Sequence, residues 1–316
     1  MASTETQTVL STAISSFINA TSLTNAGSVP YTSKPPDHNE YSRVLLAIYS
    51  VVLLSGTISL SLMMHMMKSG STSITSIAVL NLIFCHFVFL LTVPFRIYYY
   101  ASRNWSLGIG LCKVVSSMIH IHMYMSFIFY VIILITRLMA FYKNVEQLGF
   151  FRRIHAFLLS AVVWIVVLIS VPLTIVYHYG EKNKHNHSDN STCFKFGSNI
   201  TPSVKWSNYF ISTLIIVVAT VLTAFQANVV WVLYRKHHQE ITYQQDFGAQ
   251  LKSLCFALIM VVCFIPYHMF RLHYIEHIEQ ENINEVFLSL TTFTCFDMLT
   301  FLGRRSCRTC FLINCW

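Results

Sequence analysis

Charged residues are scarce in this 316-residue chain: Asp, Glu, Lys and Arg make up 11% of it, where a soluble domain has about 25%. Acidic residues are the rarer kind, with 13 Asp and Glu against 21 Lys and Arg. Apolar residues reach 54%, more than a soluble core can bury. The composition therefore excludes an ordinary soluble domain and indicates a membrane protein.

Catalytic motifs are also missing. The sequence has no Walker loop, no Gly-x-Ser-x-Gly nucleophile motif and no Cys/His set with metal-ligand spacing. The His185/His187 pair alone is weak evidence for a metal site. Internal repeats and broken helices, which are typical of transporters, are not found in the sequence either. We therefore expect no enzyme, no metal and no cofactor, and a channel or transporter is the less favoured alternative.

Seven apolar stretches are each long enough to cross a membrane, since a bilayer core of ~30 Å needs about 20 residues of helix. They are 41–67, 73–101, 108–142, 150–177, 203–234, 247–275 and 283–302. Backbone groups in lipid must bond to one another, so these stretches are expected to be helices. The predicted fold is an all-α membrane protein, a bundle of seven transmembrane helices.

The loops between these stretches differ in charge, and the difference orients the chain. Basic residues gather on one side, among them Lys143, Arg152, Arg235, Lys236 and Arg304, while the other side has mixed charge. Because cytoplasmic loops collect Lys and Arg, the N-terminus is predicted outside the cell and the C-terminus inside. The same bias accounts for the net charge of +8, so no nucleic-acid partner is expected.

The two ends of the chain differ in character from the bundle of residues 41–302. Residues 1–40 are rich in Ser and Thr and are expected to be disordered and extracellular, with no signal-peptide pattern. Residues 303–316 are expected to form a short cytoplasmic amphipathic helix, the eighth, on the inner leaflet. The predicted glycosylation sites, all on the outer side, are Asn19, Asn186 and Asn190.

Cysteine usage follows the predicted compartments. Cys112 and Cys193 are the two cysteines at extracellular positions, which predicts a disulfide. Cysteines within the spans, such as Cys295, are expected to be small packing residues. The tail cysteines are predicted palmitoylation sites, with free reduced thiols as the alternative; they are Cys307, Cys310 and Cys315.

Local motifs within the spans resemble those of the rhodopsin-like, or class A, G-protein-coupled receptors. The resemblance covers residues 41 to about 312. It implies a plasma-membrane receptor that transmits an extracellular signal to a heterotrimeric G protein. The matching residues are Asn81-Leu82, Pro94, Trp105, Cys112, Arg137, Trp164, Pro172, Cys193, Cys263-Phe264-Ile265-Pro266-Tyr267 and Cys295-Phe296-Asp297.

The predicted G-protein coupling residues are Thr136, Arg137 and Leu138 at the end of the third span. The resemblance implies that Arg137 lines the crevice that accepts a G protein. The family has an acid before this arginine and Tyr after it, where this chain has Thr136 and Leu138. The missing acidic neighbour predicts raised basal signalling. The altered positions also leave open a second hypothesis, a non-signalling membrane binder such as a decoy or partner receptor.

The predicted activation switch centres on His86, where the family has an aspartate that binds sodium with positions matching Ser126 and Asp297. Imidazole removes an oxygen ligand, so no sodium is expected here. A buried carboxylate in lipid needs a partner, which predicts a direct or water-bridged His86–Asp297 pair, charged or neutral. The alternative is a neutral His86 bonded to a backbone carbonyl. Three further switch positions, two of them altered from the family pattern, are Phe264, Pro266 and Phe301.

A ligand cavity is expected between the outer halves of the helices. Arg96, Arg271 and Lys195 supply positive charge there, which suits a carboxylate or phosphate. The predicted ligand is an anionic small molecule, such as a lipid, fatty acid or nucleotide. The alternative is that Arg96 and Arg271 reach lipid headgroups or pair with glutamates. The other predicted cavity residues are Tyr99, His120, Met123, Tyr124, Tyr267 and His268.

Overall fold

The computed structural model describes residues 38–67, 74–142, 149–178, 193–194, 202–236 and 243–297, and every regular element in these ranges is helical. All of these residues belong to one unit of the chain, His38–Trp316. Six helical segments are long and apolar enough to cross a membrane. The predicted all-α membrane fold is confirmed, whereas the predicted eighth helix lies outside the described residues and stays a prediction.

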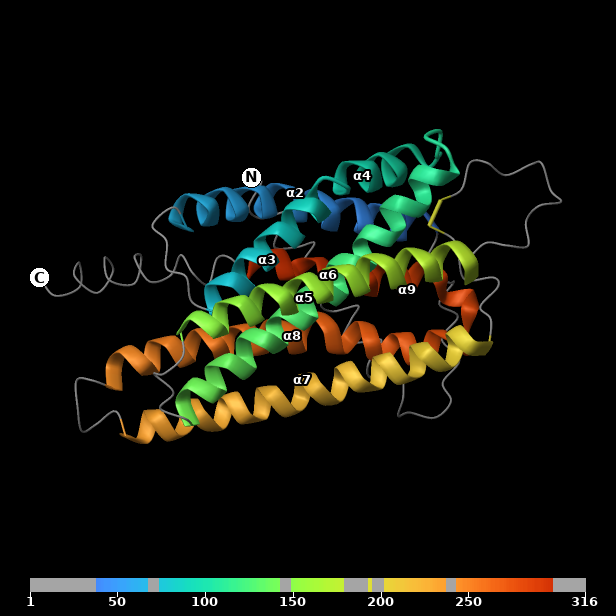
Figure 1. Ribbon diagram of the computed structural model, residues 1–316. Coiled ribbons are helices and arrows are strands. Elements are labelled where there is room, and N and C mark those ends of the chain that lie inside the picture. The colour runs from blue at the N-terminus through green and yellow to red at the C-terminus, as the bar shows by residue number, and fades with distance from the viewer. Residues whose placement is uncertain are drawn as a thin grey trace, which may run out of the picture. The chain divides into compact units, whose positions relative to one another are not determined.

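The helices follow the predicted apolar stretches to within a few residues at most ends. A short 3-10 helix, η2 (Ile278–Gln280), joins the last two long elements, and a second one, η3 (Thr291–Phe296), ends the described chain. The α-helices are α2 (His38–Met67), α3 (Ile74–Leu90), α4 (Val93–Ser102), α5 (Ile109–Tyr142), α6 (Gly149–His178), α7 (Pro202–Lys236), α8 (Tyr243–Tyr274) and α9 (Glu281–Leu290) (Figure 1).

The second apolar stretch forms two helices where one was expected. α3 ends at Leu90, and α4 begins at Val93 with Pro94 in its first turn. Proline has no backbone N–H and its ring crowds the preceding turn, so a continuous helix is disfavoured. The Thr92 hydroxyl instead donates a hydrogen bond to the Phe89 carbonyl at 2.7 Å. A single membrane span, Ser76–Ser102, runs through both helices.

The seventh stretch starts as α9 and tightens into the 3-10 helix η3. The hydroxyls of Thr291, Thr292 and Thr294 each donate to a carbonyl three residues back, at 2.6, 2.5 and 2.9 Å. Such bonds compete with the regular helical ladder. A 3-10 segment within a longer helix often marks a functional hinge, and Asp297 follows this one directly.

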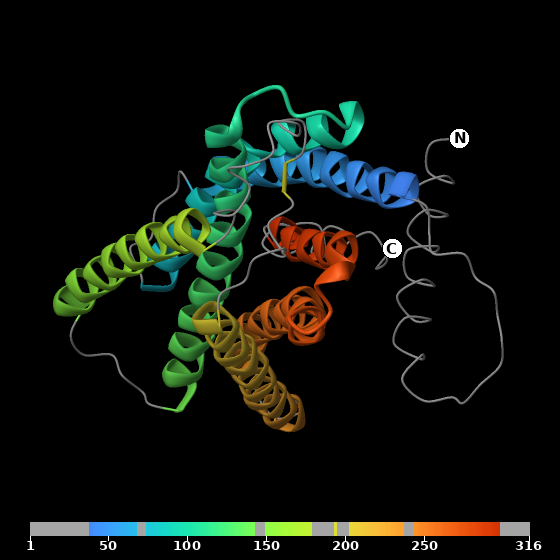
Figure 2. The ribbon, with the colours of Figure 1, turned by 90° about the vertical axis from the view of Figure 1, so that its right-hand side faces the viewer.

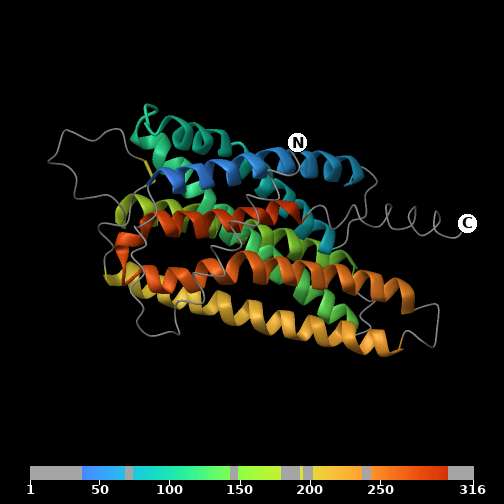
Figure 3. The same ribbon diagram turned by 180° about the vertical axis from the view of Figure 1, so that it is seen from behind.

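α5 is the central helix of the described bundle. In the most apolar stretch of α5, 61% of the residues are buried inside the bundle. The corresponding fraction is 22% in α6 and in α7, so most side chains of those two helices face outward. α3, α6 and α8 pack against α5, and α7 runs along α8. The chain from α9 into η3 lies between α2 and α8, as the end-on view of Figure 2 and the rear view of Figure 3 show.

A disulfide fastens the start of α5 to the segment that follows α6. It joins Cys112 to Cys193, as the sequence predicted. Trp105 and Phe194 pack beside it in a small cluster separate from the main core. The Trp105 indole N–H donates to the Gly108 carbonyl at 2.7 Å. This end of the bundle therefore has its own packed cap.

Candidate functional site

A cavity of about 460 Å³ opens between α5, α6, α7, α8 and α9 at the disulfide end of the bundle. Sites for small molecules usually measure ~300–1,000 Å³ and combine apolar walls with a few polar groups. Four of the predicted ligand-binding residues line it: His120 and Tyr124 on α5, and Tyr267 and Arg271 on α8. The cavity therefore lies where the sequence predicted a ligand.

Arg271 places a positive charge in this wall. Its side chain is 7% exposed. The guanidinium donates to Oδ1 of Asn208 on α7 at 3.3 and 3.4 Å, and to Oδ1 of Asn284 on α9 at 3.5 Å. It also lies 5.2 Å from the centre of the Tyr274 ring. These contacts hold a group suited to carboxylate or phosphate at the cavity surface.

Arg96 was predicted to line the ligand cavity, but it does not. It is fully buried, with Nη1 3.3 Å from Glu285 Oε2 and 3.1 Å from the Tyr49 hydroxyl, and its guanidinium stacks 4.3 Å over the Phe194 ring. The Tyr100 hydroxyl also donates to Glu285 Oε2, at 3.3 Å. Glu285 already balances the arginine, so the pairing alternative describes Arg96 better than a ligand contact does.

Three more residues that were predicted to line the cavity do not line it, because their side chains face neighbouring elements. Tyr99 lines a smaller cavity of about 110 Å³ near the disulfide. Met123 is fully buried in the core. His268 is buried, with Nδ1 3.2 Å from the Ser212 hydroxyl on α7. The predicted set was thus too wide, since sequence spacing does not fix how a helix is rotated.

A buried polar centre lies at the end of η3, deeper in the bundle. His86 Nε2 on α3 is 3.3 Å from Asp297 Oδ2, so the structure places the predicted pair in direct contact. The Tyr130 hydroxyl on α5 donates to the same oxygen at 2.5 Å. All three side chains are buried, as is that of Ser126. The carboxylate therefore links α3, α5 and η3.

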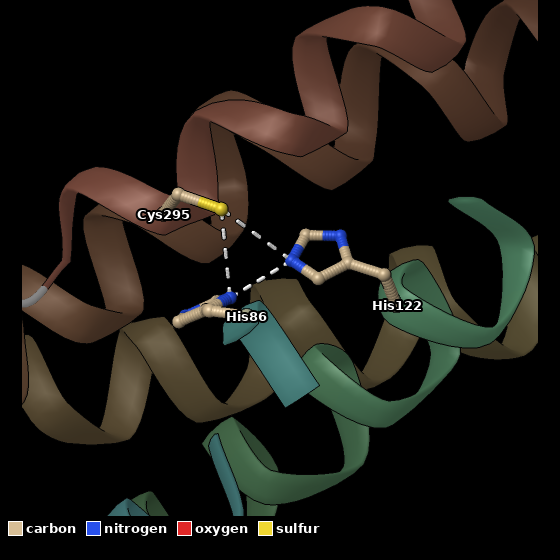
Figure 4. A group of neighbouring side chains, drawn as sticks. All are labelled: His86, His122 and Cys295. Atoms are coloured by element: carbon tan, nitrogen blue, oxygen red, sulfur yellow. Dashed lines mark hydrogen bonds between the residues drawn. The ribbon is translucent and has the colours of Figure 1, made fainter. Parts of the chain in front are cut away.

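The other nitrogen of His86 meets two further side chains. Its Nδ1 lies 2.8 Å from His122 Nε2 on α5 and 3.6 Å from Cys295 Sγ on η3, and Cys295 Sγ is 3.7 Å from His122 Nε2. Figure 4 shows the three side chains pointing toward one another from three elements. Phe89 stacks on the His122 ring with centroids 4.2 Å apart. Cys295 is therefore more than the packing residue that the sequence suggested.

One of the predicted switch residues on α8, Phe264, packs against this centre. Phe264 is fully buried and meets Tyr130 edge to face, with ring centroids 6.2 Å apart. It makes a similar contact with Phe127 at 5.6 Å. Pro266 lies within α8 two residues later. Phe264 thus connects α8 to the residue that donates to Asp297.

His122 and Tyr130 belong to the polar centre but were not predicted as site residues, and Glu285 was considered only as one of several possible partners of the cavity arginines. A signal existed for the first two, because His122, Ser126 and Tyr130 recur every four residues and so share one face of α5. The sequence could not decide which glutamate pairs with Arg96, since Glu285 lies 189 positions after it.

At the far end of α5, Arg137 is half-buried. Among the described residues, no acidic side chain forms an ion pair with it. The neighbouring Thr136 hydroxyl donates to the carbonyls of Ile132 and Ile133 at 2.7 and 2.9 Å. Leu138 is half-buried beside it. The predicted role of these residues in coupling stays a prediction.

Several predicted site residues fall outside the described part of the chain, and their roles stay predictions. They are Lys195, Phe301, the glycosylation sites Asn19, Asn186 and Asn190, and the tail cysteines Cys307, Cys310 and Cys315.

The helical bundle, its disulfide cap and its central polar residues define a class of membrane receptor. The family model described as "7 transmembrane receptor (rhodopsin family)" matches residues 56–299. The chain belongs to this family. It is therefore a multi-pass membrane protein and a receptor, not an enzyme.

Individual receptors within this family show similarity to the chain over most of its length. The chain is 38% identical to Homo sapiens "Probable G-protein coupled receptor 141" over 268 residues, which cover 82% of this chain and 87% of the relative. It is 25% identical to Rattus norvegicus "2-oxoglutarate receptor 1" over 73% of this chain and 68% of the relative. It is 24% identical to Gallus gallus "Lysophosphatidic acid receptor 6" over 72% and 74% of the two chains.

Proposed function

We propose that this chain is a plasma-membrane receptor that binds an anionic small molecule in its outer cavity and activates a heterotrimeric G protein. The observation that carries the proposal is the cavity of about 460 Å³ with the guanidinium of Arg271 in its wall. Its size suits a small molecule, and its arginine suits an acidic group.

The charges around the cavity favour a ligand with one acidic group and an apolar body. Among the described residues that line it, Arg271 is the single Lys or Arg, and Glu281 and Glu285 also line the cavity. A single arginine balances one acidic group, so a compact polyanion would leave charge uncompensated in the cavity. A fatty acid or a lipid monophosphate therefore fits better than a nucleoside triphosphate.

The names of two relatives support an acidic ligand. 2-oxoglutarate and lysophosphatidic acid, named in two of the receptors above, are both anions with carboxylate or phosphate groups. At about 25% identity the ligand itself does not transfer. The shared feature is an acidic group, which agrees with an arginine in the wall.

Signal output is proposed at the opposite end of α5. There Arg137 would contact the G protein, flanked by Thr136 and Leu138. The chain would lie with residues 1–40 outside the cell, glycosylated, and with residues 303–316 inside as an acylated amphipathic tail. Basic residues near the predicted inner ends of the spans support this orientation.

A G-protein activation assay in cells tests the ligand proposal. Wild type and Arg271→Ala are compared at equal surface expression, with the exposed Arg43→Ala as matched control. The probes are lysophosphatidic acid, a long-chain fatty acid, 2-oxoglutarate and ATP. We expect an anionic lipid to activate wild type and the control. Arg271→Ala should lose at least about tenfold in potency, because a charged hydrogen bond contributes about 1.5–3 kcal/mol.

Two results would count against the proposal. Equal potency on wild type and Arg271→Ala would remove the arginine from the ligand site. A probe that binds the purified wild-type protein but activates no G protein would favour the non-signalling binder. That alternative draws its support from the altered motif positions, among them Thr136, Leu138 and Phe301.

A further inference from the structure

We propose that His86, His122 and Cys295 form a buried site for a zinc ion that fastens α3, α5 and η3 together. The site is independent of the ligand proposed above, because none of the three residues lines the outer cavity. It also differs in chemistry from a sodium site, since its donors are two imidazole nitrogens and a sulfur.

The distances suit one ion bound by all three residues. His86 Nδ1, His122 Nε2 and Cys295 Sγ are 2.8, 3.6 and 3.7 Å apart. Three points at these distances lie on a circle of radius about 2 Å, which matches zinc–ligand distances of ~2.0–2.1 Å for nitrogen and ~2.3 Å for sulfur. The three ligands come from three elements, so bound zinc would bridge them (Figure 4).

The atoms around the three donors favour a metal-binding orientation. His86 turns its second nitrogen, Nε2, to Asp297 Oδ2 at 3.3 Å. A carboxylate on the far nitrogen of a metal-bound histidine fixes the tautomer that leaves Nδ1 free to bind. The Phe89 ring stacks on His122 and holds that imidazole in place. Tyr130 in turn holds Asp297 through its hydroxyl.

Charge balance also favours a divalent ion at this depth. All three ligands and Asp297 are at most 2% exposed, so a net charge would be costly. Zinc binding requires the Cys295 thiolate, and the thiol proton leaves as the bond forms. The thiolate and the Asp297 carboxylate together carry two negative charges, which balance the ion. Borderline-soft zinc accepts nitrogen and thiolate, and a water molecule would take the fourth position.

Metal content and a cobalt spectrum test the site directly. The full chain is purified in detergent, supplied with zinc, and separated from free metal. We expect about one more zinc per chain in wild type than in Cys295→Ser. Cys263→Ser is the matched control, because Cys263 is another buried thiol, on α8, outside the cluster. Cobalt in place of zinc should give a thiolate charge-transfer band that Cys295→Ser loses and Cys263→Ser keeps.

Two further variants separate a metal site from a hydrogen-bonded cluster. His122→Ala should lose the zinc in the same way, and it carries the test if Cys295→Ser fails to fold. Asp297→Asn keeps the ligands but weakens their orientation, so zinc affinity should fall about 10–100-fold. Equal zinc content and equal cobalt spectra in wild type, Cys295→Ser and His122→Ala would overturn the proposal. The three side chains would then form only a hydrogen-bonded cluster.

Discussion

At the scale of single residues, burial decides how each charge is held. Arg96 and Glu285 form an ion pair that is 0% and 13% exposed. Lys205 and Glu276 form another at 2.9 Å, with both side chains exposed, beyond the end of α8. Hydrogen bonds from Tyr209 and Lys205 lower the pKa of Glu276. Breaking the buried Arg96–Glu285 pair should lower stability, because it leaves an unpaired charge in the interior. Breaking the exposed Lys205–Glu276 pair should have little effect.

A double-mutant cycle on the buried pair tests this difference. Arg96→Met alone should destabilise the protein by about 3–5 kcal/mol, because it leaves Glu285 without its partner. Arg96→Met with Glu285→Gln should recover most of that loss. The change is measured as thermal unfolding of the purified chain in detergent. Lys205→Ala, the control, should leave unfolding unchanged. Additive effects of the two buried mutations would contradict a direct pair.

The sequence predicted the His86–Asp297 pair but left the Arg96–Glu285 pair as one of several alternatives, for a physical reason. Asp297 and His86 both fall deep within apolar spans, where a carboxylate needs a donor. Their contact could therefore be predicted. Arg96 lies near a span end, where it could equally reach headgroups, pair with a glutamate or bind a ligand. The orientation of α4 relative to α2 and α9 decides which partner Arg96 meets. Residue spacing along α4 alone does not determine that orientation.

At the scale of elements, α2 packs closely against the end of α3 and against η3. Gly56 on α2 is the contact point, since a Cβ there would lie 3.0 and 3.2 Å from the two methyl carbons of Leu90 and 3.6 Å from Cys295 Cβ. The position has room for little beyond a hydrogen. A side chain there must push against the end of α3 and against η3.

Substitutions at Gly56 should therefore depend on size. Gly56→Val should cost about 1–3 kcal/mol of stability, because the added methyl groups overpack the contact. Leu90→Ala in the same chain should restore part of it by clearing the space. Gly110→Ala, at a helical glycine with nothing within 4 Å, is the matched control and should be neutral. Thermal unfolding of the three variants and wild type checks this, and equal effects at Gly56 and Gly110 would count against close packing.

The elements themselves were largely predictable, but their interruptions were not. Apolar length sets where a helix crosses lipid, which is why the predicted stretches match the helices from α2 to α8 closely. Pro94 is a readable signal for the break between α3 and α4. The 3-10 segment η3 had no such signal, since its threonines also suit an α-helix in lipid. It arises from local hydroxyl bonds.

At the scale of the whole receptor bundle, α5 carries residues of all three candidate sites. His120 and Tyr124 line the outer cavity, Tyr130 holds the polar centre, and Arg137 lies at the far end. A ligand that shifts α5 would therefore act on the polar centre through the same helix. Zinc bound at His86, His122 and Cys295 would oppose any such shift, because it favours the conformation in which the three ligands meet.

The most direct test of the central claim is basal G-protein activation across all subtypes in cells. Wild type is compared with Arg137→Ala and the control Arg43→Ala, at matched surface expression. We predict basal activity in wild type and the control, because the chain has Thr136 where the family has a restraining acid. Arg137→Ala should lose that activity. Wild-type activity that is unchanged in Arg137→Ala would contradict the account, because Arg137 would then have no part in coupling.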